Sequence, residues 1–164
     1  SDAADTGVSL AFNDMSNEFA PVAARCLRAH QLVNSLDLSQ ARLSNSRCAA
    51  QVIEALEDVK APIHLIDLSS NAIGVQGCAA LGKLLAKNLL RDLNLEDCAL
   101  GDRAVGELCD ALSRGCRVSR LNLSRNKFGA EEDGAAYIFG RDRDELGVAI
   151  SANFHAFLCV QVGR

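Results

Sequence analysis

Short segments in which apolar and polar residues alternate recur along the chain at a nearly constant spacing. Four segments share one pattern: Leu36-x-Leu38-x-x-Ala41-x-Leu43, Ile66-x-Leu68-x-x-Asn71-x-Ile73, Leu93-x-Leu95-x-x-Cys98-x-Leu100 and Leu121-x-Leu123-x-x-Asn126-x-Phe128. A weaker copy is Val148-x-Ile150-x-x-Asn153. Positions 36, 66, 93, 121 and 148 lie 30, 27, 28 and 27 residues apart. This regular spacing indicates a repeat protein.

Each unit predicts a strand, a turn and a helix. The alternation of apolar residues predicts a short strand with its leucines turned inward. Asn or Cys then turns the chain and can hydrogen-bond the backbone of neighbouring turns, a role that Ala41 cannot fill. Apolar residues four apart predict the helices: Cys48, Val52 and Leu56; Gly77, Leu81 and Leu85; Ala104, Leu108 and Leu112. Because a helix is wider than a strand, the stack should curve, with strands on the concave face.

This pattern resembles the ribonuclease-inhibitor-like leucine-rich-repeat family, over about residues 30 to 155. The resemblance implies an α/β fold: a right-handed leucine-rich-repeat solenoid of about five repeats, with a curved parallel sheet on the concave face and helices on the convex face. The family includes enzyme inhibitors, GTPase-activating proteins, actin-capping domains and innate-immune receptors. The resemblance therefore implies an architecture and leaves the function open.

The two ends depart from the repeat. We expect a flexible tail over 1–13 and a helical cap over 14–32, with Asp14 or Ser16 as N-cap and Pro21 in the first turn. The cap should cover the open face of the first of four repeats, which are 33–62, 63–89, 90–117 and 118–144, together 33–144. The last of these should carry a short helix at about 131–139. Residues 145–164 read as a degenerate or truncated fifth repeat, whose apolar run either caps the last repeat or leaves an edge for a partner or a second copy.

Composition excludes several classes of function. Hydrophobic residues make up 49% and charged residues 23%, which is typical of an ordered globular domain. Aromatic residues make up 4%, tryptophan is absent and the net charge is −4, so we expect no nucleic-acid partner. No apolar run approaches the roughly 20 residues that span a bilayer, so we expect no membrane insertion.

Candidate chemistry is sparse. The seven cysteines form no Cys-x-x-Cys pair, which favours free thiols in a reducing compartment: the cytoplasm first, with nucleus and mitochondrial matrix left open. The three histidines lack partners at ligand spacing, so we expect neither a metal nor another cofactor. The sequence of 77–84 nearly matches the motif of a phosphate-binding loop. Leu84, however, lacks the hydroxyl that would bind magnesium, and the segment is predicted to be helical. We expect no catalytic residue.

The polar strand positions are the candidate site. Side chains between the inward leucines should project side by side from neighbouring strands. The candidate partner-binding residues are Asp37, Leu65, Asp67, Ser69, Asp92, Asn94, Glu96, Asp97, Arg120, Asn122 and Arg125. The face is acidic over the first three repeats and basic at the fourth, with Leu65 as a candidate anchor. A simpler interpretation is that strand positions facing water are polar.

Two functions follow from these expectations. The first is a protein–protein interaction module or scaffold subunit that binds a partner with a basic segment, and that can also associate with itself or a larger complex through the C-terminal edge. The alternative, implied by the resemblance, is a GTPase-activating protein of the RanGAP-like branch. The loops at 40–42, 70–72, 97–99 and 125–127 offer Arg42, Arg125 and Lys127, but in no arrangement that matches that branch. We predict binding and no enzymatic activity.

Overall fold

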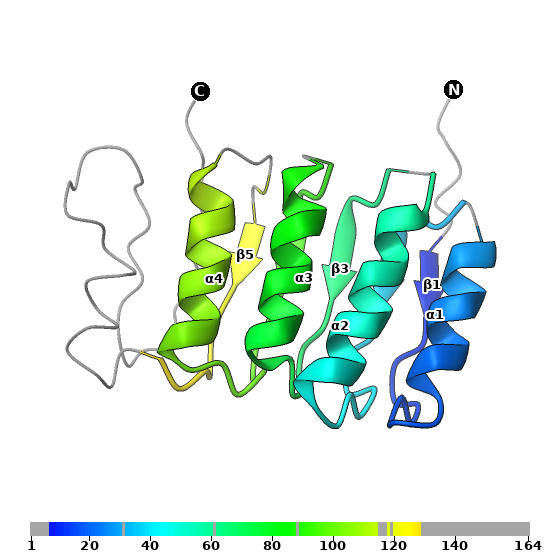
Figure 1. The fold of residues 1–164 in the computed structure, drawn as a ribbon, viewed down its shortest axis with the longest axis horizontal. Coiled ribbons are helices and arrows are strands. Elements are labelled where there is room, and N and C mark those ends of the chain that lie inside the picture. The colour runs from blue at the N-terminus through cyan, green and yellow to red at the C-terminus, as the bar shows by residue number, and fades with distance from the viewer. Residues whose placement is uncertain are drawn as a thin grey trace.

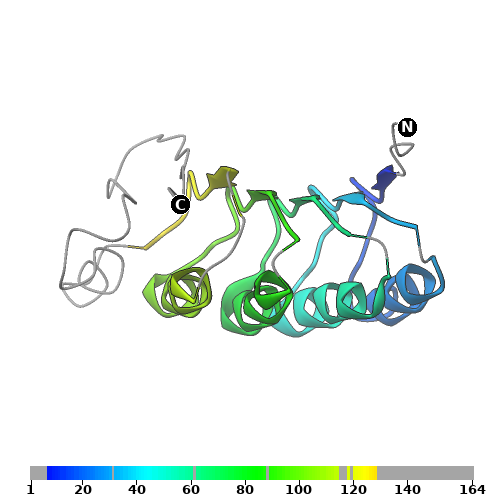
Figure 2. The same cartoon turned by 90° about the horizontal axis from the view of Figure 1, so that it is seen from above.

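Strands and helices alternate along the whole described part of the chain. The computed structural model describes residues 7–128 except 31, 61, 88, 115–117 and 119. Its elements are β1 (Gly7–Ser9), α1 (Ala20–Ala29), β2 (Ser35–Asp37), α2 (Ser46–Ala55), the 3-10 turn η1 (Leu56–Asp58), β3 (Leu65–Asp67), α3 (Gly74–Ala86), β4 (Asp92–Asn94), α4 (Asp102–Ser113) and β5 (Arg120–Asn122). The strands form one parallel sheet in chain order (Figure 1). The helices form a second layer on one side of this sheet (Figure 2), which confirms the leucine-rich-repeat solenoid.

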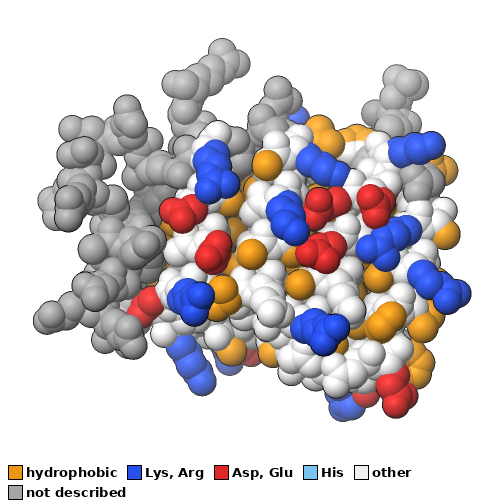
Figure 3. Space-filling model, viewed as in Figure 1, with side chains coloured by type: hydrophobic (Ala, Val, Ile, Leu, Met, Phe, Trp, Pro, Cys, Tyr) orange, Lys and Arg blue, Asp and Glu red, His pale blue; other side chains and the backbone are white. Residues whose placement is uncertain are grey.

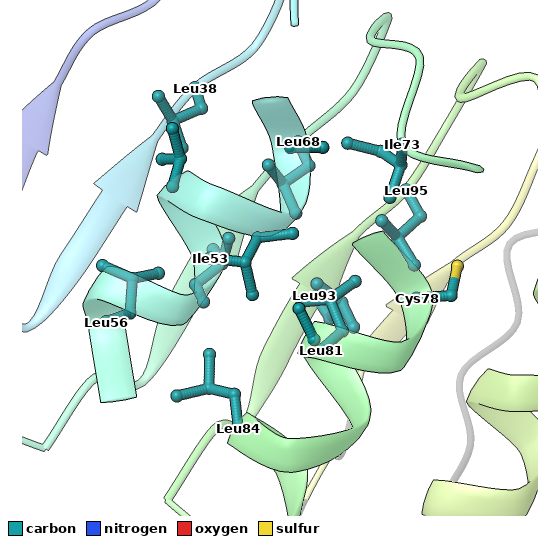
Figure 4. Close-up of a cluster of buried hydrophobic side chains, with 14 of the residues drawn as sticks. Leu38, Ile53, Leu56, Leu68, Ile73, Cys78, Leu81, Leu84, Leu93 and Leu95 are labelled. Carbon is teal, nitrogen blue, oxygen red and sulfur yellow. The ribbon is translucent and has the colours of Figure 1, made fainter. Parts of the chain in front are cut away.

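The core lies between the two layers. Val8, Leu36, Ile66, Leu93 and Leu121 occupy one register row of the sheet. Residues of this row from β2 to β5 are buried and pack towards the helices. Figure 4 shows the same packing deeper in the stack, where strand-side and helix-side leucines form one cluster. The inward positions predicted from the alternation are therefore confirmed.

The predicted hydrogen bonding at the turns is also confirmed. Asn71 is buried, and its Nδ2 donates to the carbonyls of Leu38 at 2.8 Å and Leu68 at 2.9 Å. Its Oδ1 accepts from the Leu43 N–H at 3.1 Å. In the next unit the thiol of Cys98 donates to the same Leu68 carbonyl at 3.2 Å. One polar side chain thus fastens each of these turns to its neighbour.

Asn126 repeats the arrangement one unit later. Its Nδ2 donates to the carbonyls of Leu95 at 2.7 Å and Leu123 at 3.0 Å. Ala41 occupies the equivalent position of its unit and has no side-chain donor. Towards the first unit this turn is held by backbone hydrogen bonds, such as the one from the Met15 N–H to the Ala41 carbonyl at 2.8 Å, whereas the Asn71 side chain holds it on the other side.

The N-terminus corrects our expectation of a tail over 1–13. Residues 7–9 form β1, which pairs with β2 so that Val8 lies beside Leu36. The Leu10 N–H also donates to the Asp37 carbonyl at 2.8 Å. The physical reason is that Val8-x-Leu10-x-x-Asn13-x-Met15 is a further copy of the repeat, 28 residues before the copy at Leu36. Met15 is buried like Leu43, Ile73 and Leu100 at the equivalent position of the next three units.

The helical cap expected over 14–32 is corrected with it. The helix begins at Ala20, and the N-cap residue is Phe19 without a side-chain hydrogen bond. Asp14 instead accepts from the Ser16 N–H at 3.0 Å, in a turn that precedes the helix. Pro21 lies in the first turn of the helix, as predicted. Because α1 follows its own strand β1, it is the helix of a complete repeat unit and not a separate cap.

The remaining helices agree with the predicted period. Gly77, Leu81 and Leu85 are buried on α3. The segment 77–84, whose sequence nearly matches a phosphate-binding loop, lies within this helix. The predictions for the helix at 131–139, the copy at 148–153 and the C-terminal edge lie outside the described residues.

Candidate functional site

The sheet presents two rows of side chains on the face opposite the helices, which we call the strand face. The first row contains Ser35, Leu65, Asp92 and Arg120, in register on adjacent strands. The second row contains Ser9, Asp37, Asp67, Asn94 and Asn122. Neighbouring strands of a sheet lie about 4.8 Å apart, so side chains within a row can contact one ligand together. The outward orientation predicted for these positions is confirmed, whereas binding by them stays a prediction.

Asp37 and Asp67 lie side by side in the second row, and each also stabilises its own turn. The Asp37 Oδ1 accepts from the Ser39 N–H at 2.9 Å. The Asp67 Oδ1 accepts from the Ser69 N–H at 2.8 Å and from the Ser69 hydroxyl at 2.6 Å. A carboxylate that bonds the backbone two residues on is an Asx turn, which ends a strand. These aspartates therefore have a structural role that the sequence interpretation missed.

Asn94 and Asn122 perform the same structural role in the next two units. Their side-chain oxygens accept from the N–H groups of Glu96 at 3.2 Å and Ser124 at 3.0 Å. This position thus requires an oxygen acceptor and not a charge. The signal was present in the sequence, because Asp or Asn occurs at this position in all four predicted units.

The Asp37 carboxylate is stabilised in its charged form. Burial raises its pKa, but hydrogen bonds from the Ser39 N–H and from the hydroxyls of Ser39 and Ser9 outweigh burial and lower the pKa below the ordinary value. The Ser9 hydroxyl lies 3.1 Å from Asp37 Oδ2. Asp67 receives an uncharged donor as well, from Asn94 Nδ2 at 2.9 Å. Hydrogen bonds from the described residues thus orient both carboxylates without neutralising them.

Asp92 differs from these two aspartates because it is neutralised. Both nitrogens on one side of the Arg120 guanidinium face its carboxylate: Nη2 donates to Oδ2 at 2.6 Å, and Nε donates to Oδ1. The sequence predicted a face that changes from acidic to basic at the fourth repeat. In this row the acidic and the basic residue instead form an ion pair between β4 and β5. Sequence alone could not show this pairing, since it depends on the register of the two strands.

Leu65 is the apolar residue of the first row. It is 39% exposed and lies in register between Ser35 and Asp92. On its own strand, Asp67 is the next residue on the same face. The position suits an anchor, as predicted, although binding itself is untested.

The turns at the rim share a strained backbone. Gln40, Ser70, Asp97 and Arg125 have φ angles of 51°, 56°, 54° and 62°. Such left-handed angles are uncommon for residues other than glycine. The equivalent residue of the first unit, Phe12, has a φ of 59° and a 76% exposed side chain. Sequence reasoning missed this exposed aromatic residue because it did not recognise the first unit.

The helix face offers a weaker alternative. A hollow of about 430 Å³ lies between α2 and α3, with Ala50 and Ala79 among its lining residues. The ion pair of Lys83 with Glu54, at 3.3 Å, joins its two sides. Figure 3 shows positive and negative side chains interspersed over this face. The helix face therefore mixes charges of both signs, whereas the strand face has Asp37 and Asp67 in register on adjacent strands.

Two further searches concern only the described part of the chain. Within it, no three of the His, Cys, Asp and Glu side chains are grouped so that they could hold a metal ion. None of its helices is long and apolar enough to cross a membrane.

Comparison with known proteins agrees with this architecture. A family model described as Leucine Rich repeat matches residues 63–82 and 86–109. RAN GTPase-activating protein 2 of Arabidopsis thaliana is 29% identical over 102 residues, which are 62% of this chain and 18% of that protein. The chain thus spans less than a fifth of the relative's length. The repeated pattern, the parallel sheet and the helix in each complete described unit give this chain a leucine-rich-repeat architecture, and the match to the family model supports a place in that family.

Proposed function

We propose that this leucine-rich-repeat domain is a protein-binding module whose strand face receives a partner segment that carries Lys or Arg. Leucine-rich repeats serve generally in protein–protein interaction, and the family match supports that class of function. The observation that carries the finer proposal is the pair of charged, adjacent carboxylates of Asp37 and Asp67. A basic side chain placed between them would gain two charge-assisted hydrogen bonds.

The surroundings of the pair favour an extended partner. Leu65 lies beside the acidic row and can contact an aliphatic side chain of the partner. Glu96 and Asp97 continue the acidic surface beyond the strands, where they accept hydrogen bonds from Asn122 Nδ2 at 3.2 Å and the Ser70 hydroxyl at 3.3 Å. A segment lying across the strands would thus meet several carboxylates in succession. Such charge complementarity acts mainly on the association rate and the register of binding.

The test is binding of a fluorescent peptide of alternating Arg and Leu to the wild-type domain and to the Asp37→Asn/Asp67→Asn variant. Asparagine keeps the oxygen that the Asx turn needs, as Asn94 and Asn122 show in equivalent positions. The variant should therefore fold normally. Its affinity should fall about tenfold or more, because each charged contact is worth on the order of 1 kcal/mol.

The matched control is Glu54→Gln/Asp58→Asn, which removes the same charge from exposed side chains of α2 and η1. It should bind the peptide like the wild type, and a peptide of alternating Glu and Leu should bind neither protein. An equal loss of affinity in both variants would mean that binding depends on the net charge of the protein and not on the strand face. Unchanged binding by the strand-face variant would refute the proposed site.

The relative's name supplies the alternative, activation of a small GTPase. The rim loops that would carry such a role contain Arg125, while Arg42 lies 3.9 Å from Asp14. A GTP-hydrolysis assay against a panel of small GTPases tests this alternative. Stimulation that disappears in Arg125→Ala would favour it over a purely binding function.

A further inference from the structure

The turns that follow the strands place one row of side chains along the rim of the strand face. Gln40, Ser70, Asp97 and Arg125 occupy this row in successive units, each with a positive φ angle. The N–H groups of Gln40, Ser70 and Asp97 each donate to a carbonyl of the next unit, at 2.9, 2.8 and 3.0 Å. The Ser70 hydroxyl donates to Asp97 Oδ2 at 3.3 Å, so side chains of neighbouring units can contact each other here. We call these positions the rim row.

Phe12 is the member of the rim row in the first unit. Its φ angle is 59°, and its N–H donates to the Ser39 carbonyl of the next unit at 3.0 Å, as in the other turns. Its side chain is 76% exposed. This exposure is a property of the row and not of the end of the stack. Gln40, Ser70 and Asp97 are exposed as well, although a described unit flanks each of them on both sides.

The turn itself does not require an aromatic residue at this position. The other described units have polar residues in the rim row, with nearly the same backbone angle. A positive φ is particularly unfavourable for a bulky side chain. An exposed phenylalanine also forgoes the stabilisation that burial of its ring would contribute. Because such backbone strain collects at binding sites, the residue at this position indicates a contact with a ligand.

The carboxylates of Asp37 and Asp67 lie close enough to Phe12 to share its ligand. Asp37 pairs in register with Ser9, whose hydroxyl donates to its carboxylate at 3.1 Å. Phe12 is the third residue after Ser9 in the first unit. A strand rises about 3.3 Å per residue and neighbouring strands lie about 4.8 Å apart, so the positions of Phe12 and Asp37 are at most about 11 Å apart. An extended segment spans this distance with about three residues.

We propose that Phe12 is an apolar anchor for the basic segment that the strand face receives, and that this segment carries an apolar residue about three positions from its Arg or Lys. The inference rests on the proposed function of the strand face. The binding surface then has two unlike ends, an aromatic side chain at the first unit and carboxylates from the second unit onwards. A segment that crosses the strands would therefore bind in one direction, with its apolar residue over the first unit.

The experiment compares the binding of two fluorescent peptides with capped ends. Leu-Ser-Ser-Arg-Ser-Ser-Leu has a leucine three residues to either side of arginine, so it fits whichever way its chain runs, and Ser-Ser-Ser-Arg-Ser-Ser-Ser has neither leucine. The wild type should bind the leucine peptide about five- to tenfold more tightly, because a leucine side chain is removed from water against Phe12. Phe12→Gln should abolish this preference. Gln40 shows that glutamine adopts the required backbone angle, and circular dichroism establishes that the variant is folded.

Phe19→Gln is the matched control, because it makes the same change in the same unit at a phenylalanine that precedes α1 and is 54% exposed. It should keep the preference of the wild type for the leucine peptide. A preference that persists in Phe12→Gln, that is absent from the wild type, or that disappears equally in Phe19→Gln would overturn the inference.

The anchor and the acidic site fail in different ways. Asp37→Asn/Asp67→Asn should weaken the binding of both peptides, whereas Phe12→Gln should weaken that of the leucine peptide alone. If the aspartate variant loses affinity and Phe12→Gln keeps the preference, the strand face is the site but Phe12 is not its anchor. If the aspartate variant binds both peptides like the wild type, the acidic site is refuted, and the inference that rests on it is refuted too.

Discussion

Asn71 and Cys98, which occupy equivalent turns of successive units, both donate a hydrogen bond to the carbonyl of Leu68, at 2.9 and 3.2 Å. Asn71 also donates to the Leu38 carbonyl and accepts from the Leu43 N–H. With a further hydrogen bond to the Ser69 carbonyl at 3.1 Å, Asn71 bonds four backbone groups of these turns. The Cys98 thiol has a single proton, shared between the Leu68 carbonyl and the Glu96 carbonyl at 3.5 Å. The two residues should differ in their contribution to stability.

Replacement of Asn71 by alanine should destabilise the domain more than replacement of Cys98. Asn71→Ala leaves buried carbonyls and an N–H without partners, which should cost about 2–4 kcal/mol. Cys98→Ala removes a weaker donor and leaves a smaller void, so about 1–2 kcal/mol is expected. Urea unfolding monitored by circular dichroism measures both. Equal losses would show that the side chain at this position acts by filling space alone.

The buried thiols predict a loss of stability at alkaline pH. Burial raises the pKa of Cys78 and Cys98 to about 12 and that of Cys109 to about 11, above the ordinary value of 9.0. Above pH 9 the unfolded chain releases these protons while the folded protein keeps them, so the unfolding free energy falls as pH rises. Each such thiol should contribute about 1.4 kcal/mol per pH unit until its folded pKa is reached.

Urea titrations between about pH 8 and about pH 10.5 measure this slope. The informative quantity is the difference between the slopes of the wild type and of Cys98→Ala, because it isolates the contribution of one buried thiol. Removal of one buried thiol should make the slope less steep by about 1.4 kcal/mol per pH unit. Parallel slopes in the two proteins would contradict the assignment.

The leucine pattern predicted four of the five described strands and the helices that follow β2, β3 and β4. Apolar residues that alternate, followed by apolar residues four apart, are compatible with few other structures. It failed at the first unit, where Val8 and Met15 stand in place of leucine and the stretch up to residue 13 resembled a tail. The spacing of 28 residues between Val8 and Leu36 would have identified this strand. A search by spacing, instead of by residue type, recovers it.

The sequence placed the candidate residues on the strand face but did not show which hydrogen bonds and ion pairs they form. Alternation places Asp37 and Asp67 on the strand face, yet a water-facing position and an Asx turn produce the same polar pattern. The pairing of Asp92 with Arg120 requires the register of β4 and β5, which periodicity within one segment cannot supply. Hydrogen bonds and ion pairs between units thus became visible only in the structure.

Gly74 should resist substitution for two separable reasons. Its φ is +59°, and an added Cβ would lie 2.8 Å from the Cβ of Ser46. Gly74→Ala should therefore destabilise the domain by about 1–3 kcal/mol, measured by urea unfolding. Gly101→Ala is the control, since no atom lies within 4 Å of its added Cβ. Ser46→Gly in the Gly74→Ala background removes the contact with Ser46 and leaves the backbone strain, so the unfolding free energy should recover only in part. Full recovery would mean that the positive φ does not destabilise alanine at this position.

The pairing of Arg120 with Asp92 predicts a variant that binds better than the wild type. Arg120→Ala releases a carboxylate in register with Leu65, next to the proposed site for a basic side chain. Affinity for the peptide of alternating Arg and Leu should rise about three- to tenfold, the range expected from one additional exposed ion pair. Stability should fall by about 1 kcal/mol, because the Arg120 side chain is 70% exposed while that of Asp92, which loses its partner, is 21% exposed. Arg103→Ala on α4 removes the same charge from the helix face and should leave peptide binding unchanged. If both variants gain affinity equally, net charge governs binding; if neither does, the carboxylate of Asp92 lies outside the area that the peptide contacts.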